Sequence, residues 1–325
     1  MERKALYNTL RMHLPGFPQE GQQEWQTTNF RELSIEELFN QLQRFLPTLN
    51  KKVYITYGEM FDSPEELCEC FIADGAFTPQ EQDNIYLLVF EIWRKILTHK
   101  PCLSIFCDEL DHQIHLYDEG SENGLVIQDL ITQLQTMVET AKDSGEDPSK
   151  LMQAIESQCA NHLESFIYDY IAEQVDEDQI DYAQELLDSF ESILTDQKWF
   201  QFLRIRVLAS FDYRQADVVL RDLIEVVTNE RDLEFNLQVL EFLAGWGDPQ
   251  LFVGLAIETF PLVETESDLQ EVLTLCGNYY SRLDFDDKEK TIVSMLKDRQ
   301  CIPFDTPVDK SDDLVKGLME YLQNS

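Results

Sequence analysis

Side chains that could bind a metal ion are most concentrated between Cys102 and His115. Within this segment, Glu109 and His112 stand at the i, i+3 spacing that helical bundles use for di-iron and di-manganese sites. The candidate metal ligands are Asp108, Glu109, His112 and His115. Together they define one hypothesis for the chain, a metal-dependent enzyme.

Two features of the same segment weaken the metal hypothesis. A di-metal bundle needs the Glu-x-x-His pair twice, and the sequence contains no second copy. A helix over about 104–117 would also place Leu110 and Ile114 on one face and the polar residues on the opposite face. That polar face is formed by Asp108, Asp111, His112 and His115. We therefore expect it to be solvated, and we keep the enzyme as the alternative hypothesis.

The cysteines point to free thiols. There are seven, an odd number, which is typical of a reducing compartment and not of a disulfide framework. Cys68 and Cys70 have the wrong spacing for a zinc knuckle. Cys159 and His162 lie on the apolar stripe of a helix expected over about 148–175, so we expect His162 to be a core histidine.

Motifs for nucleotide binding and nucleophilic catalysis are missing from the sequence. It contains no Walker A loop, no Rossmann glycine pattern and no nucleophile elbow. Pairs of carboxylates carry no information about catalysis, because 62 acidic residues supply such pairs everywhere by chance. We expect no cofactor.

Basic and aromatic residues gather between residues 198 and 221. The basic ones are Lys198, Arg204, Arg206, Arg214 and Arg221, and the aromatic ones beside them are Trp199, Phe200, Phe202 and Tyr213. These arginines could bind an acidic peptide through paired contacts with its carboxylates, or they could neutralise acids on neighbouring helices. For the first interpretation, the candidate partner-binding residues are Trp199, Arg204, Arg206, Tyr213 and Arg214.

Helix start signals mark the beginnings of helices in the first half of the chain. Capping patterns begin at Ser34, Ser63 and Thr78. The helix that follows Thr78 is apolar almost all round, so we expect it to be the buried centre of this half. Residues 52–57 are β-branched and aromatic, and they are the one segment that could form a strand or an extended connector.

The second half of the chain is periodic. A polar segment with Gly145 and Pro148 predicts a boundary between an N-terminal helical domain, 1–143, and a C-terminal domain, 149–325. After the helix expected over 148–175, apolar-periodic segments begin near residues 180, 197, 214, 232, 248, 267 and 285. The interval is roughly 17 residues per helix, or about 35 per hairpin, as in α-solenoids. The predicted fold class is therefore all-α, with an α-solenoid-like stack of helical hairpins in the C-terminal domain.

One hairpin carries a family resemblance. Residues 211–220, with Asp212, Tyr213 and Ala216, resemble the start of the second helix of a tetratricopeptide repeat, which commonly reads Gly-Asp-Tyr-x-x-Ala. Trp199 lies close to the place of the aromatic residue in the first helix of that family. Phe211 replaces the usual glycine, and the closing proline is missing. The resemblance implies stacked hairpins in which the small Ala216 packs against the first helix.

Charge narrows the choice of partner. With 25 basic and 62 acidic residues the net charge is −37, which repels nucleic acids and anionic membranes and favours basic proteins. No segment reaches the roughly 18 apolar residues of a membrane span. The segment from Met1 to Tyr7 is not followed by the apolar region of a signal peptide, so we expect a cytoplasmic protein.

These patterns favour a non-catalytic protein–protein interaction module: an adaptor, chaperone or regulator that holds a partner protein on a helical-repeat surface. The partner would be a basic protein, or an acidic peptide bound at the basic patch. An acidic mimic of nucleic acid is a further alternative.

Overall fold

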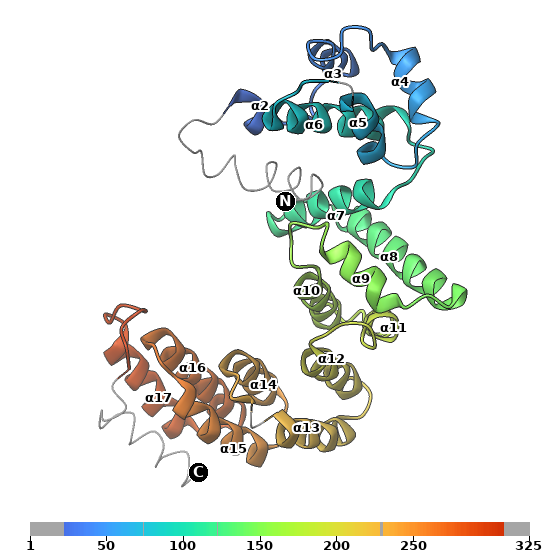
Figure 1. Ribbon diagram of the computed structural model, residues 1–325. Helices are drawn as coiled ribbons and strands as arrows, with labels where there is room; N and C mark the ends of the chain where they lie inside the picture. The colour runs from blue at the N-terminus through green and yellow to red at the C-terminus, as the bar shows by residue number, and fades with distance from the viewer. Residues whose placement is uncertain (1–22, 74, 122, 228–229, 309–325) are drawn as a thin grey trace. The chain divides into compact units, whose positions relative to one another are not determined.

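The computed structural model describes residues 23–73, 75–121, 123–227 and 230–308 (Figure 1). Within these ranges the chain forms helices joined by turns, and an isolated antiparallel bridge links Thr265 with Pro307. The predicted all-α class is confirmed. None of the helices in these ranges is long and apolar enough to cross a membrane. The segment from Met1 to Tyr7, on which the signal-peptide prediction rests, lies outside the described residues.

The chain divides into two compact units, Met1–Asp169 and Tyr170–Ser325. The first contains α2 (Glu24–Thr27), α3 (Ile35–Leu42), α4 (Lys51–Gly58), α5 (Pro64–Ile72), α6 (Pro79–Ile96), α7 (Leu103–Asp118), α8 (Gly124–Ser144) and α9 (Pro148–Glu156), and α10 (Leu163–Asp176) spans the division. Near residues 143–149, where the sequence predicts a domain boundary, the chain makes a tight turn. Gly145 ends α8 with a left-handed φ of 76°, Asp147 caps α9, and α9 packs against α8.

Helix α6 is the buried centre of the first unit, as its sequence predicts. Every residue from Ile85 to Trp93 is buried, and α3 and α5 pack against the helix. The capping boxes predicted at Ser34 and Thr78 are present, and in each the N3 glutamate bonds back to the cap. Local start signals therefore fix the ends of these helices, and apolar burial fixes their packing.

Residues 52–57 form neither a strand nor an extended connector, and that prediction is wrong. They lie in α4, whose first turn is capped by the side chain of Asn50. Tyr54 is fully buried and donates a hydrogen bond to the carbonyl of Val89 at 2.6 Å. The Asn cap and the burial of Tyr54 outweigh the modest preference of β-branched residues for strands.

The helix expected over 148–175 is broken in two. Between α9 and α10, the carboxylate of Asp111 accepts hydrogen bonds from the amides of Ala160 and Asn161, at 2.9 and 3.1 Å. The Glu156 carboxylate accepts the amide of Leu163, the first residue of α10. Since these acceptors satisfy amides that would otherwise bond within one helix, the break is stabilised by contacts that the local periodicity does not reveal.

The second unit follows the predicted interval closely. Its helices are α11 (Ile180–Phe190), α12 (Gln197–Ala209), α13 (Tyr213–Val227), α14 (Leu233–Gly245), α15 (Pro249–Thr259), the 3₁₀ turn η2 (Phe260–Leu262), α16 (Glu266–Arg282) and α17 (Asp286–Arg299). Each of the seven predicted starts lies within two residues of an observed helix start. The predicted helix starts are thus confirmed.

Contacts within the second unit alternate along the chain. Helix α12 packs against α13 and α14, α14 packs against α15 and α16, and α16 packs against α17 (Figure 1). Every second helix, α12, α14 and α16, therefore contacts both its hairpin partner and a neighbouring helix of this alternate set. A shared core runs through these helices and includes Phe202 of α12, Phe235 of α14 and Tyr280 of α16.

Candidate functional site

A groove of about 710 Å³ lies in the second unit, between α12 and α14. Residues at and just after the end of α10, and the start of α13, also line it. Phe202, Arg206 and Ala209 of α12 line it at positions i, i+4 and i+7. The facing residues of α14 are Gln238, Glu241, Phe242 and Gly245, followed by Trp246 at the end of the helix. One face of each helix therefore turns toward the groove.

Aromatic rings form much of the groove. Phe242 stands edge-on to Phe202, with ring centroids 5.8 Å apart, and stacks on Tyr213 at 6.4 Å. Trp246 is 73% exposed, although it is among the largest apolar side chains of the unit. The indole of Trp246 therefore stands open to solvent beside a packed aromatic cluster.

The charges of the groove are mostly negative. Asp176, Asp178 and Glu241 line it together with one cation, Arg206. A guanidinium nitrogen of Arg206 lies 2.5 Å from a carboxylate oxygen of Asp176, so this pair is internally neutralised. Neither Asp178 nor Glu241 has an ion-pair partner within the part of the chain that the structure describes. The groove therefore offers two uncompensated carboxylates.

Tyr213 contributes an unused hydroxyl. Its oxygen is buried and has no hydrogen-bond partner among the described residues. Burial raises the pKa of Tyr213, and the nearby Asp217 carboxylate raises it further. The hydroxyl therefore stays protonated at neutral pH.

The five residues predicted to bind a partner do not all lie at the groove. Arg206 and Tyr213 line the groove. Trp199 packs into the core, with its ring edge-on to Phe235 at 5.1 Å. Arg204 binds Asp188 and Glu191, and Arg214 is exposed on α13 away from the groove lining. The structure thus brings two of the five residues together at one cavity.

Most of the basic patch is paired with acids of the same unit. Lys198 lies 2.7 Å from both Glu230 and Asp232. Burial alone would lower the pKa of Lys198, but hydrogen bonds to Asp232 and Glu230 raise it to about 12. Arg221 is 3.9 Å from a carboxylate oxygen of Asp248. Because these cations already have carboxylate partners, the geometry does not favour the acidic peptide that was one of the two predicted partners.

The candidate metal ligands are engaged in other contacts. Arg31 donates hydrogen bonds to Asp108 at 2.5 Å and to Glu109 at 2.7 Å. Burial would raise the pKa of Glu109, yet the Arg31 guanidinium holds it below its ordinary value. His115 faces Glu119 at 3.5 Å. Among the described residues, no group of three or more His, Cys, Asp or Glu is arranged to hold a metal ion.

Two expectations about exposure are wrong. The polar face of α7 is not solvated, because Asp108 and Asp111 are fully buried against Arg31 and the turn before α10. His162 is not a core residue, because its side chain is 70% exposed. It precedes α10, and its Nδ1 accepts the amide of Ser165, so it acts as a helix cap. The error at His162 follows from treating α9 and α10 as one helix, whereas the burial of Asp108 results from its contact with Arg31.

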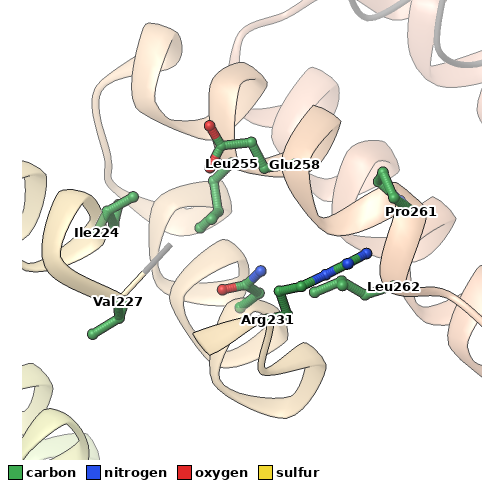
Figure 2. Close-up of a pocket in the computed structure, with 8 residues that line it drawn as sticks. Ile224, Val227, Arg231, Leu255, Glu258, Pro261 and Leu262 are labelled. Atoms are coloured by element: carbon green, nitrogen blue, oxygen red, sulfur yellow. The ribbon is translucent and has the colours of Figure 1, made fainter. Parts of the chain in front are cut away.

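A second cavity, of about 370 Å³, lies among α13, α14, α15 and η2 (Figure 2). Its wall is largely aliphatic, with Leu255 and Leu262 among its residues. Arg231 has a left-handed φ of 54°, and its side chain extends toward Pro261 and Leu262, whereas the Glu258 carboxylate points in a different direction. The polar groups of this second cavity do not converge, so the groove beside Trp246 is the stronger candidate site.

Sequence reasoning missed the residues of α14 and the acids at the end of α10. Gln238, Glu241, Phe242 and Gly245 stand at i, i+3, i+4 and i+7, so they share one helix face. That face combines a carboxylate with an aromatic ring, and a tryptophan follows just before Gly247-Asp248-Pro249. A mixed face of this kind, ending in an aromatic residue at a turn, is a signal that could have identified the groove.

Comparison of the chain with protein-family models, curated proteins and solved structures gives no match.

Proposed function

We propose that the chain is a non-catalytic protein–protein interaction module, an adaptor, chaperone or regulator that holds a partner protein on the second unit. The observation that carries the proposal is the groove between α12 and α14, which combines packed aromatic rings with the open indole of Trp246. Its volume of about 710 Å³ is large enough for several side chains of an extended segment.

The order of helix contacts supports an α-solenoid-like stack. Because α12, α14 and α16 contact one another in series, they supply a continuous surface, and each is backed by its hairpin partner. Repeat stacks bind partners on surfaces of this kind. In the hairpin that resembles a tetratricopeptide repeat, Ala216 is fully buried, which fits the role of the small residue in that family.

The proposed partner is a basic protein in the cytoplasm. A net charge of −37 speeds the capture of a basic partner and makes the capture depend on salt. The described cysteines are free thiols, which suits a reducing compartment. The metal-dependent alternative gains no support, since Asp108 and Glu109 both bind Arg31.

A photo-crosslinking experiment tests the proposal. The photoreactive residue p-benzoylphenylalanine replaces Trp246 in one full-length variant and Phe304 in another. Phe304 is the matched control, because it is 68% exposed and does not line the groove. Both variants are irradiated in native lysate, and the crosslinked proteins are identified by mass spectrometry.

We expect one protein to crosslink at position 246 and not at position 304. It should then bind the purified chain stoichiometrically and crosslink again when only the two proteins are present. Equal labelling at the two positions, or no protein crosslinked at position 246, would contradict the proposed function.

A further inference from the structure

The charges around the groove continue onto the next helix of the stack. Glu271 lies on α16, which packs against α14, the helix that carries Glu241. Burial raises the pKa of Glu271, and the like charges of Asp268 and Glu241 raise it further. The acids of α14 and α16 therefore repel one another, and a positive group placed between them would relieve the repulsion.

The aromatic rings beside these acids suit the same kind of ligand. A cation over an indole face is attracted by the ring, and tryptophan gives the strongest such contact. The long stem of an arginine or lysine also packs on aromatic surface while its charged end stays near carboxylates. Trp246 and Phe242 offer the surface, and Glu241 and Asp178 offer the charge.

We infer that the groove binds an extended, positively charged segment of the partner, with an arginine or lysine side chain lying against Trp246 and its charged end among Asp178 and Glu241. This inference rests on the proposed function and adds the chemistry of the bound segment. An acidic segment would meet two uncompensated carboxylates, and Arg206, the cation that lines the groove among the described residues, is already paired with Asp176.

The test uses the full chain and four immobilised pools of ten-residue peptides. Two central positions, separated by one residue, are fixed as arginine, lysine, citrulline or glutamate, and all other positions are random. Citrulline has nearly the shape of arginine but no charge. At 50 mM salt we expect the arginine and lysine pools to retain about tenfold more protein than the citrulline pool, and the glutamate pool to retain the least.

Two variants of equal net charge distinguish binding in the groove from attraction to the overall negative charge of the protein. The groove variant carries Asp178→Asn and Glu241→Gln, and asparagine tolerates the left-handed φ of 62° at position 178. The control variant carries Glu225→Gln and Asp298→Asn, two exposed residues that do not line the groove. We expect the preference for arginine over citrulline to fall about fivefold in the groove variant and to persist in the control.

The outcomes distinguish this inference from the proposed function. Citrulline peptides could bind as well as arginine peptides, with Trp246→Ala abolishing the binding of both pools. In that case the groove binds partners without selecting for charge, and the inference is wrong. The inference is also wrong if both double variants lose the preference equally, because the attraction is then global. If no pool binds and no protein crosslinks at position 246, the inference and the proposed function fail together.

Discussion

Arg206 on α12 and Asp176 at the end of α10 form an ion pair, with 2.5 Å between a guanidinium nitrogen and a carboxylate oxygen. The arginine is 15% exposed and the aspartate 69% exposed, so the pair lies at the edge of the groove. This contact pairs Arg206 with one of the three acids that line the groove. The other two, Asp178 and Glu241, therefore set the charge that the groove presents to a partner.

Removing this cation should therefore strengthen the binding of basic peptides. In Arg206→Gln the Asp176 carboxylate is released, and we expect the arginine pool to bind two- to fivefold more tightly at 50 mM salt, or roughly 0.4–1 kcal/mol. The gain should disappear at 500 mM salt, because exposed charges are then screened. Fluorescence anisotropy with one labelled arginine peptide measures both values. Weaker binding by the variant would mean that Arg206 itself contacts the partner.

Ala216 is expected to tolerate no larger side chain. It is fully buried in α13, which packs against α12. Ala216→Leu must force the two helices apart, which should lower the free energy of unfolding by about 1–3 kcal/mol. Val218→Leu is the control on the same helix, because Val218 is 61% exposed. Urea titration followed by circular dichroism measures both variants, and equal stability of the two would show that the hairpin is loosely packed.

Glu266 and Arg299 connect α16 to α17 through a buried, two-point contact. The guanidinium donates to both carboxylate oxygens at 2.5–3.0 Å, and both residues are at most 9% exposed. Arg299→Met leaves a buried carboxylate without this cation, and we expect a loss of about 3–5 kcal/mol. The double variant with Glu266→Leu should recover most of the loss, because no buried charge remains. Scanning calorimetry measures the three proteins, and a double variant as unstable as the single one would contradict this account.

Asp111 should make the first unit more stable in acid. Burial raises the pKa of Asp111 to about 6, above its ordinary 3.8, although the amides of Ala160 and Asn161 oppose the shift. Because the folded pKa is the higher one, the folded state binds the proton more tightly. The stabilisation is therefore complete below about pH 4 and is lost as the pH rises through 6. Its full size is about 3 kcal/mol.

The difference in stability between wild type and Asp111→Asn isolates this effect from the titration of the other acids. We expect the difference to move in favour of the wild type as the pH falls from 7.5 to 4.5. Thermal unfolding at a series of pH values measures it. A difference that does not change with pH, or that moves the other way, would show that Asp111 does not titrate in this range.

The helices of the second unit could be predicted because their signals are local. Turn residues and apolar spacing lie within each segment, so the starts near 197, 214 and 267 follow from the sequence alone. Pairing within hairpins follows from the short connections. The resemblance to a tetratricopeptide repeat implies that Ala216 is a packing residue, and it is buried.

The errors arise where a distant residue overrides the local pattern. Asp111 stabilises the break before α10 from far along the chain, and this contact also buries the polar face of α7. The pairing of Lys198 with Glu230 and Asp232 likewise joins α12 to the segment just before α14. Such contacts depend on how helices pack, so the charge of a patch cannot be read from the basic residues of one segment.

Hydrogen exchange of the full chain tests the central claim most directly, that the groove between α12 and α14 is the binding surface. The protein is measured alone and with a bound arginine peptide or the crosslinked partner. We predict slower exchange at the end of α10 and along α12 and α14, and unchanged exchange in helices α3 to α6 of the first unit. Protection confined to the first unit, or to α17, would contradict the account.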